Sequence, residues 1–398
     1  MALLLFNARV VLAHGVQHGG VLVRDGRIDH VFASEQTPAG FSRDESIDLQ
    51  GAYLAPGLID IHIHGSAGVD VQATDEEGFV KLSEFLLSEG VAGYFATLVP
   101  ADERSYDETL AGIRSHVERQ DAAGQNDIRP RARILGIHFE GPFVNGGRCG
   151  ALNARRFRTY DGDPRSVSLF TAEAPGLGRL MTLAPEIEGG LDLAREIKRS
   201  GARVFIGHSQ ADPHTLDLAA EAGACHITHF PNALDPLHHR RPGAVAWGLL
   251  RKDVTLDCIA DLHHVHPMML RLMHQAKGAD RMALISDAIK PAGLGDGEFS
   301  VWSERITVQN GRTALARRPG EDTIAGSVIT MRQALKNVVD LGVPIHEAVR
   351  MASLVPARVA GIESERGSIE QGKRADLIAL DDDFTVRLAM VSSKVRRF

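Results

Sequence analysis

Six side chains of metal-ligand type stand at the ends of five short apolar segments. They are His62 and His64 in LIDIHIHG, Glu140 closing ILGIHFE, His208 closing VFIGH, His229 closing HITH, and Asp287 closing MALISD. Each apolar run has the composition of a β-strand. In a (β/α)8 barrel the carboxyl ends of the strands meet on one face, and that face carries the active site. Five segments that bring imidazoles and carboxylates to one face therefore predict the divalent-metal centre of a hydrolase.

The spacing of these residues indicates how they could share a metal. His62 and His64 are separated by one residue, and on a strand residues i and i+2 project to the same side. This pair alone is weak evidence, because the chain has 18 histidines. Glu140, His208 and His229 are a stronger signal, since two imidazoles and a carboxylate form a three-ligand centre with an open position for water. Such ligands suit Zn, Fe, Mn or Co, so they predict a divalent transition metal without identifying it.

Two further residues are candidates for the chemistry itself. A carboxylate beside an activated water can take its proton and later give it to a leaving amine, and we expect Asp287 to be this general acid/base. The alternative for Asp287 is a helix N-cap. His264, in ADLHHVHP, is placed to polarise a carbonyl, whereas we interpret His263 and His266 as structural or solvated.

The segments that must position these residues alternate between strand-like and helical patterns. The chain contains eight apolar runs, the number needed to close a barrel. They cover residues 58–63, 91–98, 134–139, 180–184, 203–207, 225–229, 254–260 and 282–286. Helical patterns with caps or apolar stripes lie between most of them, and another is expected at about 328–341. This alternation predicts βαβ units, a parallel sheet and hence a (β/α)8 TIM barrel of the α/β class.

Three other stretches differ from this alternation. Residues 296–323 are interpreted as an inserted hairpin with Asn310-Gly311 at its turn. Residues 1–54 and 366–398 read as short strands and turns, which predicts one small β-sandwich domain built from both ends of the chain. The barrel domain then spans residues 55–365.

Composition limits the class of protein. The formal net charge of −7 over 398 residues argues against a general nucleic-acid surface. The three cysteines, Cys149, Cys225 and Cys258, form no CxxC pair, which predicts a reducing, cytoplasmic location. No run approaches the ~18 apolar residues that a membrane span needs. We therefore expect no nucleic-acid or membrane partner, and we interpret the apolar N-terminus as a strand.

The motifs extend well beyond the metal ligands. The chain contains, in order, APGLIDIHIHG, HFEGPF, LAPE, GHS, THFPNAL, HHRRPG, ADLHHVHP, SDA, IAGS and GSIEQGKRADLIALD, from about residue 54 to residue 382. This series resembles the N-acetylglucosamine-6-phosphate deacetylases of the amidohydrolase superfamily. HFEGPF and THFPNAL are specific to this branch, whereas HxH and ADLIALD are shared across the superfamily.

The resemblance implies the hydrolysis of N-acetylglucosamine 6-phosphate to glucosamine 6-phosphate and acetate. It makes Glu140, His208 and His229 the main metal ligands, Asp287 the proton shuttle and His264 the group that polarises the acetyl carbonyl. A second metal site at His62, His64, Glu140 and Asp287 is expected because this chain keeps both HxH histidines. One or two metal ions, with zinc the first choice, and a homodimer follow from the same resemblance.

The resemblance also implies the substrate contacts. Asn232, Ala233 and Arg240 would hold the phosphate, although the loop of Arg240 could equally be a solvated charge run. The turn Ile324-Ala325-Gly326 would line the acetyl and sugar pocket, beside Ala151 and Leu152. Two departures lie on the substrate side. The GAHN of the family reads GALN here, with Leu152 in place of a substrate-contacting histidine, and ADGxH reads ADLHH, with Leu262 in place of glycine.

Two alternatives stay open from the sequence. Another amidohydrolase reaction, on an unphosphorylated or different N-acyl amino sugar or on an N-acyl amino acid, is favoured by the loss of the GAHN histidine at Leu152. A non-catalytic barrel that serves as an interaction scaffold is the other alternative. It is disfavoured because a scaffold would be expected to have lost metal ligands, and this chain keeps every expected one.

Overall fold

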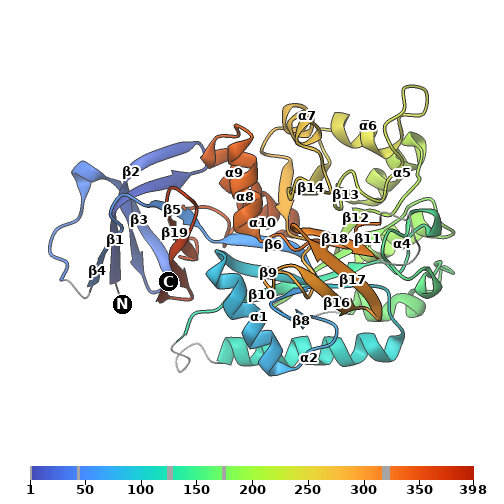
Figure 1. Cartoon of the computed structure of the whole chain (residues 1–398), viewed down its shortest axis with the longest axis horizontal. Helices are drawn as coiled ribbons and strands as arrows, with labels where there is room; N and C mark the ends of the chain where they lie inside the picture. Colours follow the sequence, from blue (N-terminus) through green and yellow to red (C-terminus); the bar gives the residue numbers. More distant parts are fainter. Residues whose placement is uncertain (1, 43–44, 123–128, 173–175, 316–322) are drawn as a thin grey trace.

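A computed structural model describes residues 2–42, 45–122, 129–172, 176–315 and 323–398. Two sheets dominate it. In Figure 1 a sheet built from both ends of the chain occupies the left-hand part of the molecule, and a barrel surrounded by helices occupies the right-hand part. Both chain termini lie in the left-hand sheet.

The barrel sheet consists of parallel strands that follow one another in chain order. Its strands are β6 (Leu58–Ile63), β9 (Val91–Leu98), β10 (Arg133–Glu140), β11 (Gly178–Leu183), β12 (Arg203–Ile206), β13 (Ala224–Ile227), β14 (Thr255–Ile259) and β15 (Met282–Ile285). Each coincides with one of the eight predicted runs to within a few residues, and the α/β barrel fold is confirmed. The ring closes where the amide of Asp287, just past β15, donates to the carbonyl of His62 on β6 at 2.9 Å.

Helices cover the outside of this sheet (Figure 1). They are α1 (Glu76–Ser88), α2 (Glu103–Ala122), the short α3 (Ser168–Thr171), α4 (Gly190–Arg199), α5 (Pro213–Ala222), α6 (Gly243–Leu250), α7 (Pro267–Lys277), α8 (Met331–Asp340), α9 (Ile345–Ala352) and α10 (Leu354–Ala360). Local sequence explains their limits, as α5 shows. The Asp212 carboxylate accepts from the amide of Thr215, Pro213 takes the first helical position, and Gly223 ends the helix at φ 116°. Among the described residues, no helix is both long and apolar enough to cross a membrane.

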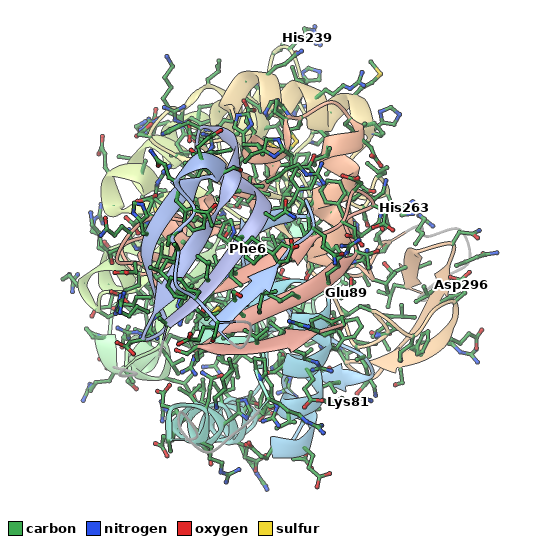
Figure 2. The ribbon with its side chains drawn as sticks, turned by 90° about the vertical axis from the view of Figure 1, so that its left-hand side faces the viewer. Phe6, Lys81, Glu89, His239, His263 and Asp296 are labelled. Atoms are coloured by element: carbon green, nitrogen blue, oxygen red, sulfur yellow. The ribbon has the colours of Figure 1, made fainter. Side chains whose placement is uncertain are left out.

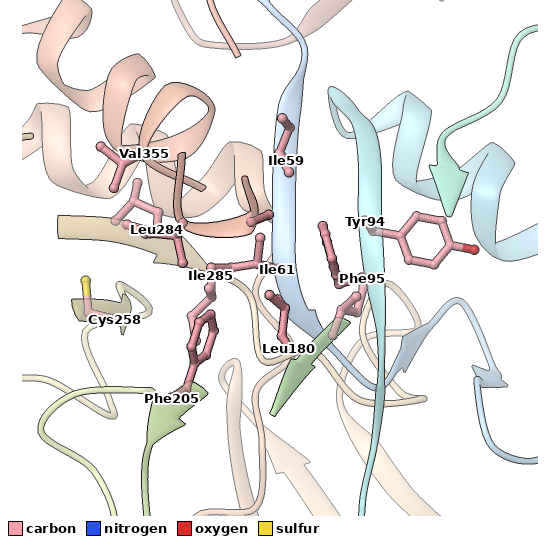
Figure 3. Close-up of a cluster of buried hydrophobic side chains, with 14 of the residues drawn as sticks. Ile59, Ile61, Tyr94, Phe95, Leu180, Phe205, Cys258, Leu284, Ile285 and Val355 are labelled. Carbon is pink, nitrogen blue, oxygen red and sulfur yellow. The ribbon is translucent and has the colours of Figure 1, made fainter. Parts of the chain in front are cut away.

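A single large apolar cluster holds strands and helices together. Figure 3 shows Ile61, Leu180, Phe205 and Ile285, contributed by four different strands, within this cluster. Val355 of α10 belongs to the same cluster, so the helical layer and the sheet share one core. Because the strands are fixed from both faces, their carboxyl ends are rigid points from which side chains can be aimed.

The terminal segments form one mixed sheet in the order β21-β20-β19-β5-β1-β2-β3, with β4 paired to β1. Its strands are β1 (Ala2–Leu12), β2 (Gly15–Arg24), β3 (Arg27–Ala33), β4 (Ser46–Asp48), β5 (Tyr53–Pro56), β19 (Leu377–Leu380), β20 (Val386–Val391) and β21 (Lys394–Arg397). The sheet has its own buried cluster, which includes Leu5, Leu54 and Leu377. β5 belongs to this sheet and β6 to the barrel, so we propose Gly57 as the junction of the two domains.

The insertion after β15 lies within the predicted bounds of 296–323 but contains one strand more than a hairpin. Asn310-Gly311 does form a turn, between β17 (Glu304–Gln309) and β18 (Arg312–Leu315). A further strand, β16 (Gly297–Val301), pairs with β17 through a two-residue turn at Trp302 and Ser303. Both turn residues have a left-handed backbone, with φ 52° and 66°. Such turns normally use Asn, Asp or Gly, so Trp-Ser gave no signal for this one.

Candidate active site

The six predicted metal ligands converge at the carboxyl end of the barrel. They form two groups of three, and within each group the candidate ligand atoms lie within 4.8 Å of one another. The first group is Glu140, His208 and His229, and the second is His62, His64 and Asp287. All six side chains are buried, with exposed fractions between 0% and 7%.

Glu140 joins the two groups. Its Oε1 lies 2.9 Å from Nε2 of His208 and 3.1 Å from Nε2 of His229. Its Oε2 lies 3.3 Å from Nε2 of His64. In the second group, Oδ1 of Asp287 lies 3.2 Å from Nε2 of His64 and 3.4 Å from that of His62. Oε1 also lies 3.7 Å from Nε2 of His62, so the Glu140 carboxylate contacts imidazoles of both groups.

Hydrogen bonds fix which ring nitrogen of two histidines is free. Nδ1 of His208 faces the carbonyl oxygen of Arg148 at 2.8 Å, and Nδ1 of His64 faces that of Thr97 at 3.2 Å. Because a carbonyl only accepts, each Nδ1 must carry the proton. Nε2 of the neutral ring is then left bare and aimed at the cluster, which is the tautomer that binds a metal.

The charge balance of the cluster also fits a cation. Burial lowers the pKa of His62 well below its usual value and so favours the neutral imidazole, the ligand form. For His64 burial acts in the same direction, but its contacts with Asp287 and Glu140 outweigh burial and raise its pKa to about 10. A positive charge is therefore favoured between the two carboxylates. Imidazole nitrogens and carboxylate oxygens that face one another at 2.9–3.4 Å are the donor set of a divalent transition metal.

Three of the candidate ligands have an unusual backbone conformation. His208, His229 and Asp287 have φ angles of 48°, 35° and 48°. This left-handed region is uncommon for residues other than glycine and is characteristic of functional sites. Each of the three follows directly on a barrel strand or lies within two residues of its end, where the turn directs the side chain toward the cluster.

Buried polar groups on the barrel strands form hydrogen bonds with the residues that carry or adjoin the candidate ligands. Asp257, on β14, accepts a hydrogen bond from the amide of His229, and its other oxygen lies 2.8 Å from Nε2 of His226. Asp60, on β6, accepts from the hydroxyl of Ser286 and from its amide. Burial raises the pKa of Asp60 to about 7. These carboxylates fix the strand ends from which His229 and Asp287 project.

A cavity of about 280 Å³ opens above the cluster. Most of the predicted site residues line it. They are His64, Glu140, Ala151, Leu152, His208, His229, Asn232, Ala233, His264, Asp287, Ile324 and Gly326. Its volume is slightly below the usual size of small-ligand pockets, which is roughly 300–1000 Å³.

Two predicted substrate residues do not line this cavity. Ala325 is fully buried and packs with Ile289 and Val301 behind the wall, so its side chain faces away from a ligand, unlike the predicted contact. Arg240 lies in an exposed loop, and its neighbour His239 projects from the top of the molecule in Figure 2. Among the described residues the Arg240 side chain makes no hydrogen bond or ion pair.

Comparison with known proteins agrees with the geometry of the cluster. A profile described as the amidohydrolase family matches residues 194–396. N-acetylglucosamine-6-phosphate deacetylase from Bacillus subtilis (strain 168) is 32% identical over 384 residues, which cover 96% of this chain and 93% of that protein. The chain belongs to the amidohydrolase family.

Two further relatives bear on the substrate. N-acetylgalactosamine-6-phosphate deacetylase from Escherichia coli O157:H7 is 34% identical over 346 residues, covering 87% of this chain and 88% of that protein. A mutant N-acetyl-D-glucosamine-6-phosphate deacetylase from Mycobacterium smegmatis, solved in complex with N-acetyl-D-glucosamine-6-phosphate, superposes with a TM-score of 0.87 at 29% identity. That match covers 99% of both chains.

In this member of the family a carboxylate orients His264. Oδ2 of Asp261 lies 2.7 Å from Nδ1 of His264, and Oδ1 of Asp261 accepts from the amides of His263 and His264. Burial raises the pKa of Asp261, but the hydrogen bond and charge of His264 outweigh it, so the pKa lies below its usual value. Nδ1 of His264 therefore carries a proton, and Nε2 is left for the cavity.

Replacing Asp261 by asparagine should lower kcat by about 10- to 100-fold, because the ring of His264 loses its fixed tautomer and part of its charge stabilisation. Metal content should not change, since Asp261 contacts no ligand of the cluster. Steady-state kinetics and metal analysis on the same preparation test this. A loss of metal together with activity would mean that Asp261 supports the fold of the site and does not act through His264.

The sequence interpretation missed several residues of this site. Three of them contact the candidate ligands, directly or through one another, by buried hydrogen bonds that no local motif predicts: Asp257, His226 and Thr97. Asp261 had a signal, because a carboxylate three residues before His264 can reach back to its ring within one turn. Trp302, which also lines the cavity, stands in a stretch interpreted only as a hairpin.

Proposed function

We propose that this protein is a metal-dependent deacetylase that hydrolyses the acetamide of N-acetylglucosamine 6-phosphate to glucosamine 6-phosphate and acetate. The observation that carries the proposal is one cavity lined by members of both ligand groups, Asp287 among them, and by His264. A chain of this family with those residues in place has the parts that amide hydrolysis needs. A cytoplasmic homodimer is part of the same proposal.

Glu140, His208 and His229 would hold the main metal ion, for which zinc is our first choice. His62, His64 and Asp287, with Oε2 of Glu140, would hold a second ion. When bound, a divalent metal lowers the pKa of water and polarises an amide carbonyl.

Asp287 is the proton carrier of the mechanism. Its carboxylate lines the cavity and is close enough to the cluster to accept a proton from an attacking water. After the tetrahedral intermediate forms, the same carboxylate donates that proton to the sugar nitrogen, which leaves as an amine. One residue therefore serves both half-steps.

His264 acts on the acetyl group. Asp261 fixes the ring with Nε2 toward the cavity, and when Nε2 also carries a proton it can donate a hydrogen bond to the acetyl oxygen as negative charge develops there. The Asp261 carboxylate stabilises the positive charge of the ring in that state. His264 and Asp287 thus act on the carbonyl oxygen and on the leaving nitrogen respectively.

The phosphate would be bound beside the PNAL turn. The main-chain amide of Asn232 already donates to the carbonyl of His229 at 2.7 Å. The amide of Ala233 makes no hydrogen bond within the described part of the chain and is free for an oxyanion. Arg240, on the loop that follows, would supply the positive charge that a phosphate needs.

Replacing Arg240 by alanine should raise KM for N-acetylglucosamine 6-phosphate by about 10- to 100-fold, because a hydrogen bond to a charged group contributes roughly 1.5–3 kcal/mol. Hydrolysis of free N-acetylglucosamine should not change. The measurement is kcat/KM for both sugars in both proteins. Arg241→Ala is the matched control, since Arg241 is an exposed arginine of the same loop.

Equal rates on the two sugars in the unaltered protein would contradict the proposed substrate. They would favour an amidohydrolase that acts on an unphosphorylated N-acyl sugar. A different acetamido sugar phosphate is the second candidate, and the N-acetylgalactosamine-6-phosphate deacetylase relative supports it. N-acetylgalactosamine 6-phosphate therefore belongs in the same assay.

A further inference from the structure

A second and larger cavity adjoins the catalytic one. Its volume is about 710 Å³, against about 280 Å³ above the metal ligands. Three residues, Ala151, Leu152 and Trp302, line both cavities. They form the partition between a small chamber in which the reaction occurs and a large chamber to which the proposed mechanism assigns no role.

The partition is apolar and supported from behind. Leu152 is 4% exposed and packs with Val99 and Val144, and Trp302 packs against the same cluster. On the catalytic side, the Trp302 ring meets the His64 ring edge to face, with centroids 5.0 Å apart and planes at 84°. The indole therefore stands directly beside one of the metal ligands and closes that side of the catalytic cavity.

The orientation of the substrate in the catalytic cavity follows from the proposed function. The amide carbon carries the sugar nitrogen on one side and the acyl carbon on the other. If the sugar phosphate lies toward Asn232 and Ala233, the carbonyl lies at the metal cluster. The acyl group then points away from the sugar, toward His64 and Trp302.

We propose that Trp302, backed by Leu152, restricts the substrate to a short acyl group such as acetyl, and that the large cavity is the space that a longer acyl chain would enter without the indole. The chemistry of the partition supports this assignment. Leu152 and the indole offer an apolar surface to an acyl methyl group in the catalytic cavity. In the large cavity Leu152, Val99 and Pro100 continue that surface along part of a wall that also carries polar and charged side chains.

The left-handed backbone conformation of Trp302 allows the indole to be removed without straining the turn. Its φ of 52° is a conformation that glycine adopts at no steric cost, so Trp302→Gly removes the indole and relaxes the turn at the same time. Ser303, the other turn residue, has φ 66° and is exposed. Ser303→Gly is therefore a matched control that makes the same backbone change and leaves the indole in place.

The experiment measures kcat/KM for the N-acetyl, N-propanoyl and N-butanoyl derivatives of glucosamine 6-phosphate. In the unaltered protein and in Ser303→Gly we expect each added methylene to lower kcat/KM by at least about 10-fold. This is the lower end of the effect of one methylene in a closed pocket. In Trp302→Gly the ratio of kcat/KM for the N-acetyl sugar to kcat/KM for the N-butanoyl sugar should fall by at least about 100-fold. The main reason is that hydrolysis of the N-butanoyl sugar becomes faster. Calorimetric binding of the N-butanoyl sugar to Asp287→Asn protein, with and without Trp302→Gly, should show the same gain without catalysis.

The possible failures are distinguishable. A Trp302→Gly protein that still hydrolyses the N-acetyl sugar but keeps the original acyl selectivity overturns this inference and leaves the proposed function intact. An unaltered protein that hydrolyses none of these sugar phosphates contradicts the proposed function, and the inference is overturned with it.

Discussion

Replacing His208 by alanine should strip the main metal ion and reduce deacetylase activity to the background rate. In the part of the chain that the structure describes, His208 is one of three candidate ligands in its group, and its Nε2 lies within 3.1 Å of both Glu140 and His229. With one imidazole gone, the remaining pair cannot complete a three-ligand centre. The measurement is metal per chain by elemental analysis after dialysis, together with activity on N-acetylglucosamine 6-phosphate. His263→Ala is the matched control, because His263 is an exposed histidine near the site that contacts no ligand.

The second ligand group should respond differently. Replacing both His62 and His64 by alanine should lower the metal stoichiometry and leave some activity, because Glu140, His208 and His229 stay in place. A double variant as inactive as His208→Ala would contradict this division. The HxH pair would then be essential to the reaction, and the two groups would have to be treated as one centre.

The convergence of the candidate metal ligands could be predicted because it depends on two regular features. The apolar runs mark the barrel strands, and a residue that follows such a run must lie at the carboxyl end of the barrel. This rule predicted that Glu140 and His208, which are 68 residues apart in the chain, lie at the same end of the barrel, and in the structure Nε2 of His208 lies 2.9 Å from Oε1 of Glu140. The position of a residue at the end of a strand is enough to place it at the carboxyl end of the barrel. Each contact between residues distant in the chain therefore did not have to be predicted separately.

Other parts of the site depend on contacts that no local pattern encodes. Asp257 acts through the amide of His229, and Asp60 through Ser286, which lies on the opposite side of the ring closure. The register of neighbouring strands decides whether a carboxylate on a strand forms a hydrogen bond to a residue of the site or is an ordinary buried group. The sequence alone does not determine that register to the required accuracy.

The conformation of loops likewise limits how well the residues of the substrate pocket can be predicted from the sequence. The IAGS motif predicted a pocket wall, but the chain turns so that Ala325 packs inward while Ile324 and Gly326 face the cavity. Trp302 occupies a turn whose left-handed backbone normally excludes tryptophan, so pattern rules could not place it. Substrate selectivity is therefore the property least accessible to sequence analysis here.

Replacing Asp287 by asparagine should lower kcat by about 10⁴-fold or more, the top of the range for a positioned general acid/base. The loss should reach that limit because one carboxylate serves both proton transfers, and an amide can neither accept the proton of the water nor deliver it to the amine. The substitution should leave the fold intact. Asn tolerates the φ of 48° at this position. The main-chain bonds from Asp287 to the carbonyl of His62 and from Ser327 to the carbonyl of Asp287 do not involve the side chain.

The test must separate proton transfer from metal binding, because Oδ1 of Asp287 also lies 3.2 Å from Nε2 of His64. Metal content and substrate affinity should therefore be measured on the same protein as kcat. A variant that keeps the ion held by Glu140, His208 and His229, binds the substrate normally and turns over at background rate assigns the loss to the missing base. Near-normal turnover would place the base elsewhere, and His264 would be the next residue to replace, because it is the other titratable side chain that faces the cavity and is not among the metal ligands.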